Sequence, residues 1–194
     1  MGSAAAVKEA KAALRRQIVS DLAKISAAER LAASAQARAL LENQRAWRQA
    51  TVVLLFAPLP AELDIWPLLA GIIAAGKVAS LPRFVAETGR YTACRVQDPE
   101  RDVRPGRFGI REPNPLCPEV PLNRLDFVLA PGVAFDLHGR RLGRGKGFYD
   151  QLLAGVRGTT CGVAYDEQIV REVPVEPHDV YLNCILTPTR WIEL

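Results

Sequence analysis

A short, basic and glycine-rich stretch is the part of this sequence whose residue types best suit chemistry. Of the nine residues from Gly139 to Gly147, four are glycines and four are cations, with Leu142 as the exception. Glycines let backbone N–H groups approach a ligand closely, and arginine and lysine neutralise its negative charge. The stretch lacks the Ser or Thr that follows the lysine of a Walker A loop, and its spacing differs from a dinucleotide fingerprint. It therefore indicates a polyphosphate site, with a flexible basic surface loop as the alternative.

An aspartate follows this glycine-rich stretch at the start of an expected helix. Asp150 has two interpretations there: an N-cap of the helix, or a ligand of Mg²⁺, which binds one or two carboxylates together with phosphate oxygens. Zinc is not expected, because the sequence has no Cys-x-x-Cys pair and only two histidines, His138 and His178. We expect the cysteines to be reduced thiols, at Cys94, Cys117, Cys161 and Cys184.

Helices and strands that could position these residues are indicated by apolar spacing. Two N-terminal helices are expected, over 7–25 and 26–50, and the second opens with a capping box in which Glu29 follows Ser26 by three residues. Residues 98–123 hold six prolines without periodicity, so we expect one long loop. The remaining expected elements are strands at 51–56, 77–81 (ending at Pro82), 91–96, 125–130, 159–164 and 184–186, and helices over 65–75 (closed by Gly76) and from about Tyr149.

The order of these elements predicts one α/β domain spanning residues 1–194. Strands that alternate with helices favour a mostly parallel sheet flanked by helices. In such sheets ligands bind outside the carboxyl ends of the strands. The expected strand over 125–130 leads into the glycine-rich stretch, so we expect the binding site at that edge.

The composition excludes several classes of protein. The chain has 194 residues, of which 49% are hydrophobic and 24% charged, so it can bury a core without disulfides or a structural metal. No apolar run reaches the roughly 18 residues of a membrane span, and no secretory signal is apparent. The net charge of +4 suits an anionic small molecule and is too weak to indicate nucleic acid. We expect a cytoplasmic monomer that acts on small molecules, with no nucleic-acid or membrane partner.

Residues 131–150 resemble the signature of the 5-formyltetrahydrofolate cyclo-ligase family, also called 5,10-methenyltetrahydrofolate synthetases. The family pattern is P-G-x-A-F-D-x-x-G-x-R-L-G-x-G-x-G-[YF]-Y-D, and this chain meets every fixed position. The resemblance extends over nearly the whole chain, through 11–15, 26–30 with Ser34, 56–64 and 173–179.

The resemblance implies an α/β fold of the cyclo-ligase type (NagB/RpiA/CoA transferase-like) and one reaction. With ATP and Mg²⁺, the formyl oxygen of 5-formyltetrahydrofolate would be phosphorylated, and N10 would then attack the activated carbon. The products would be 5,10-methenyltetrahydrofolate, ADP and phosphate. Such phosphoryl transfer is mostly positioning and charge neutralisation, which glycine N–H groups, arginine, lysine and Mg²⁺ supply.

The resemblance also implies roles for individual residues. Arg144 and Lys146 would lie nearest the transferred phosphoryl group, and Glu62 and Tyr149 would contact the folate. Asp150 and Asp179 would hold Mg²⁺. ATP would be bound by Lys11, Arg15, Arg141, Leu142, Gly143, Arg144, Gly145, Lys146, Gly147, Phe148 and Tyr149.

Structural roles for the same residues stay open beside these functional ones. Lys11 and Arg15 would share one helix face, which alone would suit a solvated basic surface. Glu62 and Asp179 would also suit a solvated loop and a turn, and Tyr149 a place in the core. Two other functions stay open as well: a related ATP-dependent enzyme with another substrate, and a non-catalytic module that binds phosphate, nucleotide or RNA. Aromatics make up only 7% of the chain, which argues against the RNA-binding form.

Overall fold

The computed structural model describes residues 2–106, 109–176 and 179–194. Its helices are α1 Gly2–Leu22, α2 Ala27–Glu42, α3 Arg45–Gln49, α4 Leu68–Ala74, α5 Pro99–Asp102 and α6 Phe148–Leu153, with 3₁₀ turns η2 Leu122–Arg124 and η3 Asp166–Gln168. Its strands are β1 Val52–Leu54, β2 Val78–Val85, β3 Arg90–Val96, β4 Val103–Pro105, β5 Arg111–Pro113, β6 Glu119–Val120, β7 Phe127–Pro131, β8 Ala134–Phe135, β9 Arg141–Leu142, β10 Thr159–Val163, β11 Cys184–Leu186 and β12 Trp191–Glu193.

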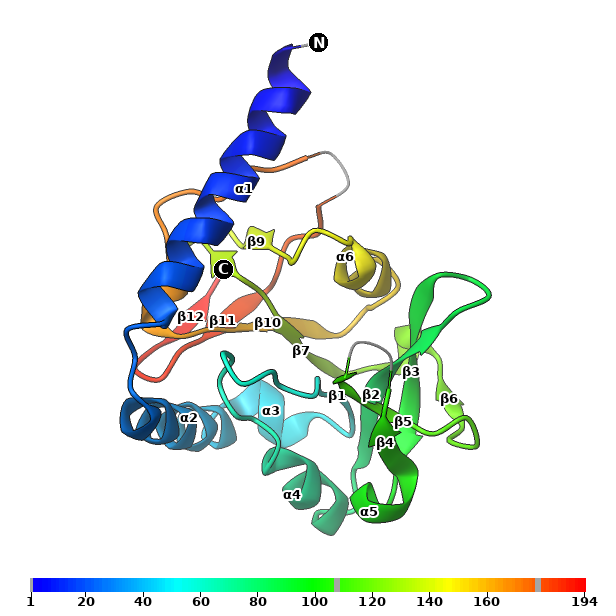
Figure 1. Cartoon of the computed structure of the whole chain (residues 1–194). Helices are drawn as coiled ribbons and strands as arrows, with labels where there is room; N and C mark the ends of the chain where they lie inside the picture. Colours follow the sequence, from blue (N-terminus) through cyan, green and yellow to red (C-terminus); the bar gives the residue numbers. More distant parts are fainter. Residues whose placement is uncertain (1, 107–108, 177–178) are drawn as a thin grey trace.

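An eight-stranded sheet forms the centre of the molecule, in the order β12-β11-β10-β7-β1-β2-β3-β6 (Figure 1). The five strands from β11 to β2 are parallel, whereas β12, β3 and β6 pair antiparallel at the edges. Helices α2 to α4 lie below the sheet in Figure 1, and α1 and α6 lie above it. The predicted α/β class with a mostly parallel sheet is therefore confirmed. The antiparallel edges and β12 were not predicted.

The central strands are buried on both faces. Val53 and Phe127 belong to one core cluster, where Phe127 packs edge-on against Trp47 of α3 at a ring-centroid distance of 5.6 Å. Their neighbours Leu54 and Val128 belong to a second cluster with Leu152 of α6. This double burial accounts for the continuous apolar runs by which the sequence predicted these strands. All four cysteines are also buried and unpaired.

Helix α1 ends at Leu22, three residues before the predicted end. The guanidinium of Arg30, in α2, donates hydrogen bonds to the backbone carbonyls of Leu22 and Ile25. It thereby satisfies carbonyls that a helix end leaves without partners. The N-terminal end of α1 projects from the body of the molecule (Figure 1). In the part of the chain that the structure describes, no helix is both long and apolar enough to cross a membrane.

The second predicted helix is two helices, α2 and α3. Its capping box is confirmed, since Glu29 N–H donates to Ser26 Oγ and Ser26 N–H donates to the Glu29 carboxylate. The break falls at Asn43, whose side-chain amide donates to the Ala39 carbonyl at 3.0 Å. Asparagine competes with the helix by such local hydrogen bonds, so the long apolar pattern overstated the length of the helix.

Strand β2 continues through Pro82 to Val85, whereas the sequence predicted that it ends at the proline. Residues two apart in a strand direct their backbone groups to the same side, and the Ser80 carbonyl accepts from the N–H of Leu55 on the β1 side. The nitrogen of Pro82 therefore faces the β1 side, beyond the last paired residues, Leu54 and Ser80. Because no hydrogen bond is lost there, β2 keeps its antiparallel pairing with β3.

The predicted long loop over 98–123 is wrong, because this segment folds into α5, β4, β5, β6 and η2. Strands β4 and β5 pair with each other, and β6 joins the edge of the main sheet beside β3. Strands of two or three residues are too short to show a period, and β6 also has its partner, β3, more than 20 residues earlier in the chain.

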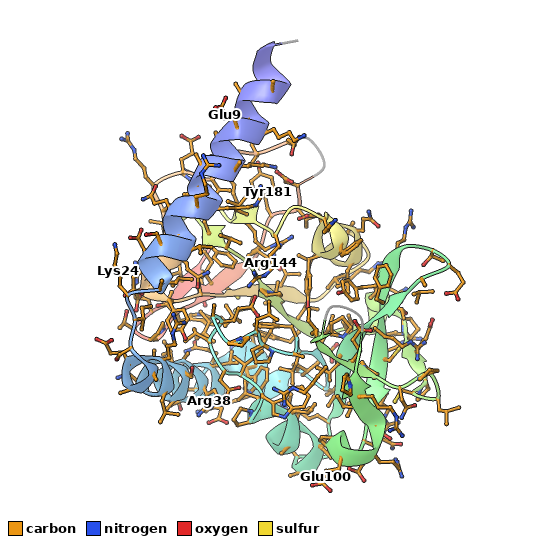
Figure 2. All side chains as sticks on the ribbon, in the orientation of Figure 1. Glu9, Lys24, Arg38, Glu100, Arg144 and Tyr181 are labelled. Atoms are coloured by element: carbon orange, nitrogen blue, oxygen red, sulfur yellow. The ribbon has the colours of Figure 1, made fainter. Side chains whose placement is uncertain are left out.

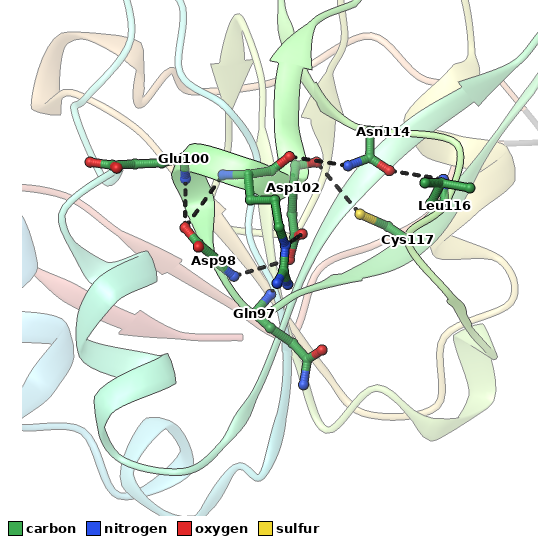
Figure 3. Close-up of polar contacts among 8 residues, drawn as sticks. Gln97, Asp98, Glu100, Asp102, Asn114, Leu116 and Cys117 are labelled. Atoms are coloured by element: carbon green, nitrogen blue, oxygen red, sulfur yellow. Dashed lines mark hydrogen bonds and ion pairs between the residues drawn. The ribbon is translucent and has the colours of Figure 1, made fainter.

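A buried carboxylate, Asp102, organises the start of this segment (Figure 3). It accepts hydrogen bonds from the backbone N–H groups of Gln97 and Asp98, at 2.9 and 3.0 Å, and from Nε of Arg101 at 2.9 Å. Its own carbonyl accepts from the Asn114 N–H at 2.7 Å. Asp102 thus ties α5 to the segment that follows β5.

Candidate active site

A cavity of about 370 Å³ opens at the carboxyl ends of β1 and β7. Its walls come from the residues after these two strands, from β2 and β3, from β5, and from the glycine-rich stretch with the start of α6. The cavity lies at the edge of the sheet where the sequence predicts the binding site. The residues of the sequence prediction that line the cavity are Glu62, Arg141, Gly143, Arg144, Lys146, Gly147, Phe148, Tyr149 and Asp150.

The glycine-rich stretch has more regular structure than a loop. Strands β8 and β9 form a small hairpin, which pairs Phe135 with Arg141. Leu142 is fully buried in the core, so its side chain cannot contact ATP, and only its backbone is left for the predicted role. After this hairpin, Gly145 and Gly147 have φ angles of +97° and +68°, which favour glycine. Gly147 caps α6, so the irregular part of the stretch leads straight into that helix.

A partly buried ion pair joins the glycine-rich stretch to α6. Nη2 of Arg141 lies 2.5 Å from Oδ1 of Asp150, and Nη1 donates to the carbonyl of Pro131 at 3.2 Å. The Arg141 side chain is 2% exposed. Because Gly147 is the N-cap of α6, the N-cap interpretation of Asp150 is wrong. Asp150 instead lines the cavity and holds Arg141 in place.

The predicted folate residue and a predicted phosphate residue contact each other across the cavity. Oε1 of Glu62 lies 2.8 Å from Nη2 of Arg144, which appears near the centre of Figure 2. The second oxygen of Glu62 accepts from the N–H of Leu59 at 2.9 Å, and the Glu62 carbonyl accepts from the Tyr165 hydroxyl at 3.4 Å. These hydrogen bonds fix the turn that carries Glu62.

Ser34 supports the same segment from α2. Its hydroxyl donates to the carbonyl of Arg30 at 2.7 Å and accepts from the backbone N–H of Asp64 at 2.9 Å. Arg30 in turn donates to the Ala61 carbonyl at 3.3 Å. The family-like residues at the start of α2 therefore position the Glu62 segment rather than line the cavity.

Helix α1 contributes two predicted ATP residues, and neither lines the cavity in this structure. Nε of Arg15 donates to the carbonyl of Gly143 at 2.9 Å, so Arg15 holds the glycine-rich stretch. Nζ of Lys11 lies 2.7 Å from both Glu176 and Asp179. Burial lowers the pKa of Lys11, but hydrogen bonds to these two carboxylates outweigh it, and the net shift is upward. Lys11 therefore carries its charge and ties Glu176 and Asp179 to α1.

Aromatic rings form one wall of the cavity. The ring of Phe148 lies 5.2 Å from that of Phe84 and 5.5 Å from that of Tyr91, and Tyr149 lies 6.0 Å from Tyr91, all between centroids. Burial raises the pKa of Tyr149 well above its usual value, so its hydroxyl stays neutral. Apart from its place in an expected strand, no sequence pattern marks Tyr91 as a cavity residue, because only the β2–β3 pairing brings it to α6.

The predicted Mg²⁺ ligands fit an ion that arrives with a phosphate rather than one held by the protein alone. Asp150 lines the cavity but pairs with Arg141, and Asp179 pairs with Lys11. Among the residues described, no group of three or more histidine, cysteine or acidic side chains could hold a metal. Mg²⁺ commonly takes one or two carboxylates and completes its shell with phosphate oxygens and water. His178, one of the two histidines whose small number argued against a zinc site, lies outside the described residues.

Comparison with known proteins identifies the family. The family model of the 5-formyltetrahydrofolate cyclo-ligases matches residues 7–188. The chain belongs to the 5-formyltetrahydrofolate cyclo-ligase family. It is 35% identical to the Escherichia coli K12 5-formyltetrahydrofolate cyclo-ligase over 145 residues. The matched region covers 73% of this chain and 80% of that protein. The mouse protein of the same name is 27% identical over 95% of this chain and 96% of its own length.

A solved structure supports this membership of the cyclo-ligase family. The NMR structure of the Aquifex aeolicus 5,10-methenyltetrahydrofolate synthetase has a TM-score of 0.85 and 33% identity, and covers 95% of this chain and 92% of that one. The predicted cyclo-ligase fold is therefore confirmed. The roles of the individual residues stay predictions.

Proposed function

We propose that this protein converts 5-formyltetrahydrofolate into 5,10-methenyltetrahydrofolate and consumes ATP, with ADP and phosphate as the other products. The observation that carries the proposal is one cavity lined both by Glu62, suited to a pterin, and by Arg144 and Lys146, suited to phosphates. Membership of the cyclo-ligase family and the names of the relatives support the choice of substrates.

The folate side of the cavity would be the Glu62 segment and the aromatic wall. The amino-pyrimidine edge of a pterin presents adjacent N–H donors, and a carboxylate accepts such donors strongly. Phe148 and Tyr149 would pack against the flat ring system. Since Glu62 is held by its own turn, its carboxylate is oriented before the substrate arrives.

The ATP side would be the irregular part of the glycine-rich stretch. Gly145 and Gly147 would bring backbone N–H groups to the phosphates, and Arg144 and Lys146 would neutralise the charge that develops on the transferred phosphoryl group. Arg15 would hold the stretch in shape through the carbonyl of Gly143.

The reaction would proceed in two steps. The formyl oxygen attacks the γ-phosphorus of ATP, the bond from that phosphorus to the β–γ bridging oxygen breaks, and ADP leaves. N10 then attacks the formyl carbon and loses its proton, and phosphate departs with the former formyl oxygen to leave the methenyl bridge. Neither step needs a protein nucleophile, so cations, backbone donors and a cavity that orders the two substrates suffice.

Asp150 would hold Mg²⁺ together with the phosphates of ATP. When bound, the ion would neutralise charge on the phosphate oxygens. Asp179 would join it only if its ion pair with Lys11 opens.

The test is a spectrophotometric assay of methenyltetrahydrofolate with each component omitted in turn. We expect absorbance to rise only when 5-formyltetrahydrofolate, ATP and Mg²⁺ are all present. No product, together with intact ATP binding, would contradict the proposal and would favour a related enzyme with another substrate. ATP binding without turnover of any formylated substrate would favour a non-catalytic module.

A further inference from the structure

Glu112, on β5, is a third carboxyl group in the wall of the cavity beside Glu62 and Asp150, and the proposed reaction leaves it without a role. It comes from the segment 98–123, which the sequence predicted to be a loop. Glu62 reaches the cavity from the segment after β1, so the two glutamates belong to different parts of the fold.

In the described part of the chain, one oxygen of Glu112 has a hydrogen-bond partner and the other has none. Oε2 accepts a hydrogen bond from the backbone N–H of Phe84 at 3.2 Å. Oε1 is buried, as is Glu112 as a whole, which is 7% exposed. Oε1 accepts no hydrogen bond from the described residues. Burial raises the pKa of Glu112, and the Phe84 N–H and the charge of Arg83 offset only part of that shift.

The backbone of the same segment packs against this carboxyl group. A Cβ on Gly106 would lie 2.5 Å from Cδ of Glu112, so only glycine fits there without displacing the side chain. A buried acceptor without a hydrogen-bond partner lowers the stability of the fold, and the large majority of buried polar groups in folded proteins have a partner. Among the described residues, Glu112 therefore carries an unsatisfied acceptor on a side chain that lines the cavity.

We propose that Glu112 is a folate-recognition residue whose Oε1 accepts a hydrogen bond from an N–H group of the reduced pterin ring. This inference rests on the proposed function, because it requires a reduced folate in the cavity. Glu62 and Glu112 would then bind the ring from two walls. Two acceptors that bind donors at different places on the ring system fix its orientation, and with it the direction of the formyl group.

The test uses Glu112→Gln, which separates the two oxygens. The amide oxygen still accepts from Phe84 N–H, and the amide nitrogen then replaces Oε1, so an acceptor becomes a donor. Glu119→Gln is the matched control, because Glu119 lies on the adjacent β6, its side chain is 60% exposed and it does not line the cavity. The probes are tetrahydrofolate, which has no formyl group to react, and a non-hydrolysable ATP analogue, each measured by calorimetry.

We expect Glu112→Gln to weaken tetrahydrofolate binding about tenfold or more and to leave binding of the ATP analogue within about twofold. The KM of Glu112→Gln for 5-formyltetrahydrofolate should also rise, while its melting temperature should stay close to that of the wild type. Glu119→Gln should resemble the wild type in ligand binding, KM and melting temperature. Glu112→Asp, which keeps the charge but withdraws the carboxyl group by one methylene, should also lose folate affinity selectively.

Two results would overturn the inference. Unchanged tetrahydrofolate binding in both Glu112 variants would show that Oε1 does not contact the folate. Equal losses for both ligands, with a fall in melting temperature, would assign Glu112 a structural role only. Failure of the proposed function is distinct, because then the wild-type protein itself would neither bind tetrahydrofolate nor form product.

Discussion

Glu62 and Arg144 are expected to serve different substrates, yet they pair with each other in the cavity. The Glu62 side chain is 10% exposed and the Arg144 side chain 53% exposed. An ion pair with one exposed partner contributes on the order of 1 kcal/mol or less. Substrate groups can therefore displace this ion pair. The folate must break it to reach Glu62, and ATP must break it to reach Arg144.

This pairing leads to a prediction for Arg144→Gln. Without nucleotide, the variant should bind tetrahydrofolate up to about fivefold more tightly, because Glu62 loses a competing cation. Its kcat should fall by about tenfold or more, because the phosphoryl group loses that cation. Calorimetry and steady-state turnover measure the two effects. Arg140→Gln is the control, since Arg140 pairs with Glu172. Weaker folate binding by Arg144→Gln would mean that Arg144 itself contacts the folate.

Lys146 is the second cation of the phosphate side, and it is exposed, so its removal should not affect folding. We expect Lys146→Ala to lower kcat by about 100-fold and to change the KM for the folate by less than about threefold. Lys24→Ala is the control, because Lys24 is an exposed lysine at the periphery of the molecule (Figure 2). Near-normal kcat in Lys146→Ala would contradict the assignment of the phosphate site.

At the scale of elements, the approach of β10 to β7 depends on Gly158. A Cβ there would lie 2.2 Å from the backbone oxygen of Leu125 and 2.4 Å from that of Asp126. We expect Gly158→Ala to lower the free energy of unfolding by about 2 kcal/mol or more, measured by chemical denaturation. Gly71→Ala is the contrasting control: nothing lies within 4 Å of a Cβ on Gly71 in α4, and the change should stabilise by about 0.5–1 kcal/mol. Equal stability of the two variants would contradict this packing.

Asp102 makes the stability of the β4–β5 segment depend on pH. The hydrogen bond from Arg101 is the main cause that lowers the pKa of Asp102 from 3.8 to about 2, and the N–H groups of Gln97 and Asp98 add to it. A carboxyl group whose pKa is lower in the folded state stabilises the fold above its unfolded pKa. That stabilisation is lost as the pH falls from about 4 through about 2.

We therefore expect Asp102→Asn to be less stable than wild type by about 1–2 kcal/mol at pH 7, a range that allows for the exposure of Arg101. The difference should shrink toward zero as the pH falls from about 4 to about 2. Chemical denaturation of both proteins across this range measures it. A difference that does not depend on pH would show that the carboxylate charge is not what stabilises the segment.

For the whole molecule, the sequence predicted what local patterns determine. The buried runs predicted the central strands, and the glycines and cations of 139–147 predicted one side of the cavity. The features that the sequence did not predict depend on contacts between distant segments. Pro82 is compatible with β2 only because β1 has already ended. Tyr91 reaches the cavity only through the antiparallel pairing of β3 with β2, and Glu112 only through the separate β4–β5 pair, which contacts β2 at Phe84. Neither residue has a neighbouring motif that signals its place.

The cavity also depends on the whole molecule, because its walls come from separate parts of the chain. Arg15 of α1 holds the glycine-rich stretch, Ser34 of α2 holds the Glu62 segment, and β5 supplies Glu112. The two substrate sides are therefore positioned by different elements around one space. The central claim is that within this space the formyl oxygen is transferred to phosphate.

Oxygen transfer from labelled substrate tests that claim most directly. The protein would be given 5-formyltetrahydrofolate with ¹⁸O in the formyl group, together with ATP and Mg²⁺, and the released phosphate would be examined by mass spectrometry. We predict one ¹⁸O atom in the phosphate for each methenyltetrahydrofolate formed. Unlabelled phosphate, with the ¹⁸O released to water, would show that ATP is hydrolysed apart from ring closure and would contradict the account.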